Sequence, residues 1–336
     1  MEFTGATIMS PWPIVGHEWA VGLLEEAVRA DHLSHAYLLT GSPHVGKTTL
    51  ATAFAQALVC ARGAGYPCGK CAACQRIPQG RYPDVQTIAA EKATIQIDQV
   101  RALQADAALS PLEGRYRVFI IQEIERATLP AANALLKILE EPSPHVLLVL
   151  TSARRDRVLP TILSRCQVIG LRPLPLAQIQ EALTRQWNVA PDQAALLARL
   201  SCGALGWAVQ AHSDTELWQT RARILDEFQT FAARDVLQRL SYSEALSRQK
   251  DQLENVLGMW MTWWRDVLLM QQGLPDAIVN LDRRAQLSQQ ADLHTPEAVT
   301  GALRDLTLTY RRLNANVNAR LALDVLMLRL PAPAAA

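Results

Sequence analysis

The fold of this chain is decided by the segment Gly41-Ser-Pro-His-Val-Gly46-Lys47-Thr48. The segment fits the pattern G-x-x-x-x-G-K-[ST] without a mismatch, follows an apolar run at 35–40 and opens a helical run at 47–59. Glycines let the backbone wrap a phosphate, and the N–H groups at the start of the helix face the anion. The alternative is a glycine turn that precedes a lysine by chance, and the flanking strand and helix favour a phosphate-binding loop.

This loop indicates the candidate cofactor. Lys47 suits contact with the β- and γ-phosphate oxygens, and the Thr48 hydroxyl suits a Mg²⁺ shell. We therefore predict that the chain binds ATP with Mg²⁺. The candidate nucleotide-binding residues are Gly41, Gly46, Lys47, Thr48 and Thr49.

The acidic residues that hydrolysis requires are incomplete. A Walker B strand ends in an Asp that binds the metal and a Glu that orients water, whereas the run 118–123 ends in Gln122-Glu123. An amide is a weaker Mg²⁺ ligand than a carboxylate. Glu123 is the candidate catalytic residue, and Glu125 lies outside the expected position. We expect nucleotide binding with little or no ATPase activity of the chain's own.

Apolar and amphipathic runs alternate through the first half of the chain, the pattern of βαβ units around a parallel sheet. The runs 117–121 and 146–150 are those of central parallel strands, which are apolar on both faces. The predicted strands span 35–40, 84–89, 117–122, 146–151 and 167–171, and the predicted helices span 18–30, 47–59, 97–109 and 130–140.

Only helical periodicity follows residue 175, with a short segment at 176–212 and a longer one at 214–330. Two apolar stripes in the longer segment recur at three- and four-residue spacing. We predict that both stripes form the core of a helical bundle rather than a ligand site. The stripes are Leu253, Val256, Leu257, Trp260, Trp263, Trp264 and Val267, and Leu313, Val317, Leu321, Val325 and Leu328.

Four cysteines precede the second predicted strand. Cys60, Cys68, Cys71 and Cys74 suit a tetrahedral Zn²⁺ shell with no open coordination position, so the site would be structural. In an intracellular protein this cluster favours metal over disulfides. We predict a zinc module inserted at 60–74, with unligated surface thiols as the alternative.

Composition excludes several classes of protein. The chain has 336 residues with Lys+Arg 33 against Asp+Glu 32, so it is not a globally basic nucleic-acid coat. Any DNA contact must come from local patches or from a partner. The longest apolar run, 146–150, is far shorter than the roughly 20 residues of a membrane span, and no secretory signal is visible. We expect a soluble cytoplasmic protein of several domains.

Together these features resemble the delta-prime subunits of the bacterial DNA polymerase III clamp loader, members of the AAA+ superfamily close to the gamma/tau motor subunits. The resemblance covers nearly the whole chain. Besides the loop and the cysteines, it rests on Ile14-Val-Gly16-His17, His32-Leu-Ser-His35-Ala36, Tyr82-Pro-Asp84, Ala131-Ala-Asn-Ala-Leu-Leu-Lys137, Leu139-Glu-Glu-Pro142 and Leu159-Pro-Thr-Ile-Leu-Ser164-Arg165-Cys166.

The resemblance implies a domain order for the chain. An α/β AAA+ nucleotide-binding domain with the zinc insertion would occupy 1–173. A small helical lid would follow at 174–212, then an all-α collar domain at 213–331 and a tail at 332–336.

The resemblance also implies residue roles that spacing alone does not. Arg165 would act in trans as an arginine finger, stabilising charge on the γ-phosphoryl group of ATP bound to a neighbouring subunit. Thr151 would be the sensor 1 residue that reads the γ-phosphate. Motor subunits carry a sensor 2 arginine where this chain has Gly206. This departure and Gln122 favour a stator with feeble hydrolysis over a motor.

The implied function is that of a clamp-loader subunit. The collar would assemble with gamma/tau and delta subunits in a hetero-pentamer, and the complex would use ATP to load the sliding clamp onto primer-template DNA. Two rivals stay open: an ATP-hydrolysing gamma/tau-type motor, and a zinc-stabilised scaffold with a vestigial nucleotide pocket. Hydrolysis by the chain alone would favour the motor, and assembly without ATP binding would favour the scaffold.

Overall fold

The computed structural model describes residues 12–331, except 64, 92, 232–234 and 316. Those residues divide into two compact units. The first unit holds the described chain up to Trp187 together with Ser201–Trp207, and the second holds the remainder. The predicted tail at 332–336 lies outside the described residues, and the division into three domains at 173 and 212 stays a prediction.

The first unit is built on a five-stranded parallel sheet. Its strands are β1 (Ala36–Thr40), β2 (Val85–Ile88), β3 (Arg117–Ile121), β4 (Val146–Ser152) and β5 (Gln167–Gly170), which confirms all five predicted strands. The strand order is β2-β3-β4-β1-β5, and Leu38 of β1 lies opposite Leu150 of β4 and Val168 of β5. β1, β3 and β4 are buried throughout, which explains their largely apolar sequences.

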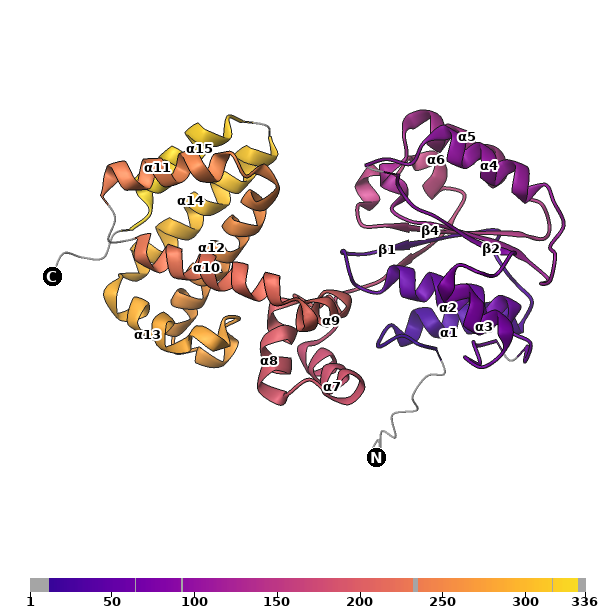
Figure 1. Ribbon diagram of the computed structural model, residues 1–336, viewed down its shortest axis with the longest axis horizontal. Helices are drawn as coiled ribbons and strands as arrows, with labels where there is room; N and C mark the ends of the chain where they lie inside the picture. The colour runs from indigo at the N-terminus through magenta and orange to yellow at the C-terminus, as the bar shows by residue number, and fades with distance from the viewer. Residues whose placement is uncertain (1–11, 64, 92, 232–234, 316, 332–336) are drawn as a thin grey trace. The chain divides into compact units, whose positions relative to one another are not determined.

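Helices cover both faces of this sheet (Figure 1). One face carries α1 (Glu18–Arg29), α2 (Lys47–Val59) and α3 (Ala72–Arg76), and the other carries α4 (Ile97–Ala107), α5 (Leu129–Glu140) and α6 (Pro160–Leu163). Each face has its own buried core, one around Phe54 and the other around Leu135. The four helices predicted in this half are confirmed as α1, α2, α4 and α5.

Short elements complete the first unit. Single 3₁₀ turns follow α3, β3 and β4, and a further helix follows β5. These elements are η1 (Ile77–Gln79), η2 (Ile124–Arg126), η3 (Arg155–Arg157) and α7 (Leu176–Trp187).

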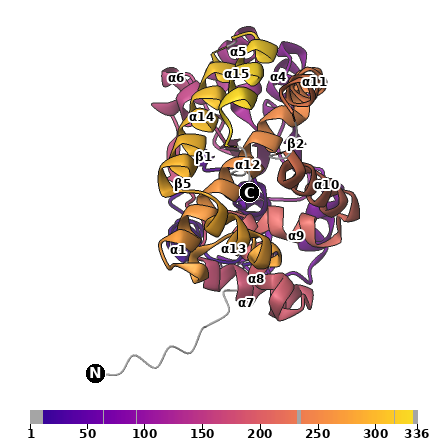
Figure 2. The ribbon, with the colours of Figure 1, turned by 90° about the vertical axis from the view of Figure 1, so that its left-hand side faces the viewer.

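The described residues of the second unit form helices and connecting turns. The helices are α8 (Pro191–Leu200), the later part of α9 (Leu205–Ser213), α10 (Thr215–Phe231), α11 (Val236–Ser247), α12 (Lys250–Gln271), α13 (Arg284–Leu293), α14 (Pro296–Asn314) and α15 (Ala319–Arg329), with 3₁₀ turns η4 (Pro275–Ala277) and η5 (Leu281–Arg283). In Figure 2, α12 lies between α10 and α14, both of which it contacts. Within the described part of the chain, no helix has the length and apolar character that crossing a membrane requires.

The first predicted stripe is confirmed as the core of this unit. Its members on α12 are all buried, and Trp260 and Trp263 are among the largest fully buried side chains of the described chain. The Phe228 ring of α10 stacks on Trp260 with centroids 4.7 Å apart. The tryptophans of α12 therefore fill the core of the bundle.

The prediction that the second stripe forms part of the core is wrong. α15 buries Leu323, Leu326 and Met327, whereas Leu321 is 63% exposed and Leu328 is 55% exposed. Both sides of this helix are apolar, so periodicity offers no means of choosing the buried one. Of the predicted residues, Leu313 packs partly against the core, and Val317, Leu321, Val325 and Leu328 are exposed. We call Leu321, Val325 and Leu328 the α15 outer face.

Candidate functional site

The phosphate loop connects β1 to α2, as the sequence predicts. Gly46 has a φ of 108° and Gly41 a φ of 152°, conformations that residues with a side chain rarely adopt. A Cβ on Gly41 would lie 2.6 Å from the Leu171 carbonyl oxygen, so only glycine lets the loop pass this close to the end of β5. Thr48 and Thr49, in the first turn of α2, are exposed. The loop and the helix start together have the geometry that suits an anion.

Lys47 is the buried cation of this loop. Its side chain curls back, and Nζ donates to the carbonyl oxygens of Gly41 and Ser42 at 2.8 Å each. Burial lowers the pKa of Lys47, while the carboxylates of Glu125 and Glu123 act in the opposite direction. The Nζ therefore has acceptors that a phosphate would replace, and nearby carboxylates that partly offset the effect of burial on its pKa.

Glu123, the predicted catalytic residue, follows β3 in a left-handed conformation with a φ of 51°. Its N–H donates to the Thr151 hydroxyl at 3.1 Å, so the structure brings the predicted sensor 1 residue to the end of β3. Its carboxylate pairs with Arg126, whose Nε lies 3.2 Å from Oε2. The Glu123 carboxylate is thus held by an arginine of its own turn.

Glu125 is a residue of this site that sequence reasoning missed. The η2 turn brings its carboxylate to the end of β4, where Oε1 accepts a hydrogen bond from the Ala153 N–H at 2.7 Å. Its Oε2 is buried and has no hydrogen-bond partner among the described residues. The Walker B pattern does not include this position. Glu125 reaches the site only because the chain turns tightly after β3, and the sequence pattern does not predict that turn.

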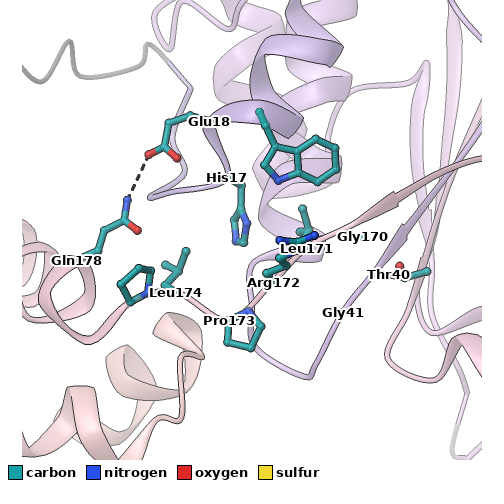
Figure 3. A pocket seen from close by; sticks show the side chains of 12 residues that line it. His17, Glu18, Thr40, Gly41, Gly170, Leu171, Arg172, Pro173, Leu174 and Gln178 are labelled. Atoms are coloured by element: carbon teal, nitrogen blue, oxygen red, sulfur yellow. Dashed lines mark hydrogen bonds between the residues drawn. The ribbon is translucent and has the colours of Figure 1, made fainter.

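A cavity of about 780 Å³ opens beside the loop, lined by the carboxyl ends of β1 and β5 and by the start of α1. Figure 3 shows His17 and Arg172 in this cavity, with Glu18 and Gln178 hydrogen-bonded at 3.2 Å beside them. His17 Nε2 donates to the Val45 carbonyl oxygen at 3.0 Å and so ties the cavity wall to the phosphate loop. The volume falls within the range of small-molecule sites.

Gly206, at the start of α9, lies against the phosphate loop. Its N–H donates to the His44 carbonyl oxygen at 2.9 Å, and a Cβ here would lie 2.8 Å from that oxygen. A larger residue would therefore push α9 and the loop apart. Gly206, which stands where motor subunits carry the sensor 2 arginine, therefore makes a contact that only glycine permits.

The four cysteines converge at the opposite end of α2 from the loop. Their Sγ atoms all lie within 4.8 Å of one another, a spacing that suits a single four-coordinate metal ion. Cys68 Sγ accepts a hydrogen bond from the Cys71 N–H at 3.4 Å, and Cys71 Sγ accepts one from the Cys74 N–H at 3.5 Å. The 13 residues of α2 span about 20 Å, so this cluster is separate from the phosphate site.

The surroundings of the thiols favour a bound cation. The N–H groups of Lys70 and Cys71 lower the pKa of the Cys68 thiol to about 6. Burial raises the pKa of Cys74 to about 12, and a bound metal ion would offset this by stabilising the thiolate. Gln56 of α2 fixes the Cys74 backbone by donating to its carbonyl oxygen at 2.6 Å. The donor set is compatible with a structural zinc site.

Arg165 lies between α6 and β5, and its side chain is 35% exposed. Its Nη2 lies 2.8 Å from Glu140 Oε1, and its Nη1 donates to the Thr161 carbonyl oxygen at 3.0 Å. These partners belong to α5 and α6 rather than to the phosphate loop. The predicted site residues therefore form three separate groups: the loop with Glu123 and Thr151, the cysteines, and Arg165.

Comparison with known proteins places the chain among replication proteins. The family described as "DNA polymerase III, delta subunit" matches residues 16–175, and the family described as "DNA polymerase III, delta subunit, C terminal" matches residues 215–331. DNA polymerase III subunit delta' of Bacillus subtilis is 31% identical over 311 residues, which are 92% of this chain and 94% of that protein.

Two further relatives match about half of the chain. Subunit delta' of Pseudomonas aeruginosa is 41% identical over 172 residues, 50% of this chain and 51% of its own length. DNA polymerase III subunit tau of Escherichia coli is 35% identical over 198 residues, 57% of this chain and 31% of its own length.

The parallel sheet, the phosphate loop at the end of β1 and the helices that follow define the class: a P-loop protein of the AAA+ type. Within that class, the chain belongs to the delta-prime family of DNA polymerase III clamp-loader subunits. The resemblance found in the sequence is confirmed, and with it a place in DNA replication.

Proposed function

We propose that this chain is the stator of its clamp loader: it binds ATP, hydrolyses it feebly or not at all, and lends Arg165 to ATP on a neighbouring gamma/tau-type subunit. The proposal rests mainly on the residues that follow β3. Gln122 occupies the position of the metal-binding acid, and the Glu123 carboxylate pairs with Arg126. Of the two acids that a Walker B strand supplies, only Glu123 is present, and its partner here is Arg126, so this end of the sheet is poorly equipped for hydrolysis.

The residues present fit Mg²⁺-ATP. Lys47 would exchange the carbonyl oxygens of Gly41 and Ser42 for phosphate oxygens, and the exposed Thr48 hydroxyl is free to face the metal ion. The buried Glu125 Oε2 offers an acceptor without a partner among the described residues. When bound, Mg²⁺ neutralises phosphate charge.

Arg165 suits a role in trans. Its pair with Glu140 is partly exposed, and such pairs contribute at most about 1 kcal/mol. Exchanging Glu140 for a γ-phosphate on another subunit therefore costs little. Arginine fingers generally raise the rate of phosphoryl transfer by roughly 10³–10⁵. This gain at the neighbour's ATP site would outweigh the loss of the pair with Glu140.

The cysteine cluster would hold Zn²⁺ as a structural ion. Cys60, Cys68, Cys71 and Cys74 would close the shell and fix the segment between α2 and α3. Because this cluster lies about 20 Å of helix away from the loop, zinc would take no part in nucleotide chemistry.

The second unit would join the collar with gamma/tau and delta subunits. The α15 outer face supports this role, because exposed apolar side chains at helical spacing suit burial against a partner helix. The assembled complex would load the sliding clamp onto primer-template DNA in the cytoplasm. A net charge of +1 is consistent with DNA contacts shared among subunits.

Nucleotide binding and turnover by the purified chain test the proposal, with Lys47→Ala as the control. The stator account predicts Lys47-dependent binding of ATP with negligible turnover. The intact Lys47-Thr48 pair favours a motor as the second candidate, and turnover abolished by Lys47→Ala would establish it. Absence of binding, with assembly intact, would establish the scaffold instead.

A further inference from the structure

The two oxygens of the Glu125 carboxylate have different surroundings. Oε1 accepts the Ala153 N–H at 2.7 Å and so joins η2 to the chain that follows β4. Oε2 is buried and has no hydrogen-bond partner in the part of the chain that the structure describes. A buried carboxylate oxygen without a partner is costly, and such atoms in native folds call for an explanation such as an ion.

The Glu125 carboxylate is close enough to the phosphate loop for its charge to act on Lys47. The charges of Glu125 and Glu123 both raise the pKa of the buried Lys47 against the effect of burial, and the effect of Glu125 is the larger. Ala153, which holds Oε1, follows Thr151 and Ser152 at the end of β4. Glu125 therefore lies where the ends of β3 and β4 face the phosphate loop.

The neighbouring candidates for a metal ligand are weaker. Gln122 offers a neutral amide, which Mg²⁺ binds less well than a carboxylate. The Glu123 carboxylate is half-exposed and paired with Arg126 at 3.2 Å. Glu125 is partly buried, and its Oε2 is fully buried and left unbonded by the described residues.

We propose that Glu125 replaces the missing acid at position 122 as the carboxylate that binds the Mg²⁺ of a bound nucleoside triphosphate, directly or through a metal-bound water. The inference rests on the proposed nucleotide binding. It makes Mg²⁺-nucleotide binding compatible with Gln122, while Glu123 stays paired with Arg126. The chain would then hold Mg²⁺-ATP although the acid at position 122 is missing.

The test is the effect of Mg²⁺ on nucleotide affinity, measured with a fluorescent ATP analogue in EDTA and in saturating Mg²⁺. The full chain is compared with Glu125→Gln, with Glu123→Gln as the rival candidate for the metal ligand, and with Lys47→Ala as the control for the site. Glutamine keeps an oxygen for the Ala153 N–H, so Glu125→Gln should fold normally, as its thermal unfolding will show.

We expect Mg²⁺ to tighten binding by the wild-type chain and by Glu123→Gln. In Glu125→Gln the enhancement by Mg²⁺ should fall by about 10- to 100-fold, the usual effect of losing a group that supports a metal. Binding in EDTA should be as tight as in the wild type or tighter, because a negative charge beside Lys47 has gone.

Two results would overturn the inference separately from the proposed function. An undiminished Mg²⁺ effect in Glu125→Gln, or its loss in Glu123→Gln alone, would leave nucleotide binding intact and remove Glu125 from metal binding. Absence of any Lys47-dependent binding by the wild type would instead remove the nucleotide site itself, and the role of Glu125 with it.

Discussion

Arg165 and Glu140 form an ion pair in which Nη2 and Oε1 lie 2.8 Å apart, with both side chains partly exposed. The pair joins the Ser164-Arg165-Cys166 segment to the last turn of α5. Water screens both groups, so the pair orients the guanidinium without committing it to Glu140.

Removing the acid should therefore have small effects. Glu140→Gln is expected to change the free energy of unfolding by less than about 1 kcal/mol and the ATPase rate of the assembled complex by less than about fivefold. Urea unfolding of the chain and steady-state ATPase of the complex measure the two effects. A loss as large as that of Arg165→Ala would contradict a weak pair and would mean that Arg165 depends on Glu140 for its position.

The metal content of the purified chain should be close to one zinc per chain. Cys74→Ser is expected to abolish zinc binding, because the four-coordinate site would lose one of its four ligands, the most buried of the cysteines. Cys166→Ser is the matched control, since Cys166 is a partly buried thiol outside the cluster whose pKa burial raises to about 12. Elemental analysis by mass spectrometry measures the ratio. Equal metal content in the two variants would refute the assignment.

Asp84 is a buried carboxylate whose effect on stability should depend on pH. It accepts the N–H groups of Leu112, Glu113 and Gly114 at 2.7 Å each. Burial alone would raise the pKa of Asp84, but these N–H groups outweigh it and hold the pKa below its ordinary value. Its stabilisation is therefore present above the unfolded-state pKa of about 3.9 and is lost as the pH falls toward the lower folded value.

Asp84→Asn is expected to lower the free energy of unfolding by about 2 kcal/mol at pH 7, because the amide group brings donors where three N–H groups need acceptors. The difference from the wild type should shrink below about pH 4, as the wild-type carboxyl becomes protonated. Urea unfolding at a series of pH values measures this. A difference that is the same at pH 3 and pH 7 would contradict the assignment of the stabilisation to the charged form.

The α15 outer face should matter for assembly and little for folding. Leu321 is 63% exposed, so Leu321→Asp is expected to change the free energy of unfolding by no more than about 0.5 kcal/mol. It should weaken assembly with gamma/tau-type and delta subunits, because a charge would be buried against a partner. Leu323→Ala, at a fully buried position of the same helix, should cost about 2–5 kcal/mol of stability instead. Normal assembly of Leu321→Asp would exclude this face from the interface.

The fold of the first unit was predictable because its signals are local. The apolar runs of β3 and β4, the glycines at 41 and 46 and the lysine that opens α2 each restrict the backbone on their own. The cysteine cluster was predictable for the same reason, since ligand spacing along the chain already limits where four sulfurs can meet.

The remainder depends on contacts between distant segments. Glu125 enters the site because η2 turns the chain after β3, and the contact of Gly206 with His44 joins segments that are far apart in the sequence. The inner and outer faces of α15 are both apolar, so only the packing of α11 and α14 against it determines which one is buried. No periodicity encodes that choice.

The most direct test of the account is the ATPase rate of the reconstituted clamp loader, stimulated by the sliding clamp and primed DNA, with Arg165→Ala in this chain. Sedimentation should show intact assembly. Hydrolysis at the neighbouring ATP site that Arg165 would serve should slow by roughly 10³–10⁵. In a single-turnover experiment, the fast phase of ATP hydrolysis should therefore lose the contribution of that site. Lys47→Ala in this chain should leave that fast hydrolysis in place. Full stimulated hydrolysis with Arg165→Ala would contradict the account, because Arg165 would then serve no ATP site on a neighbour.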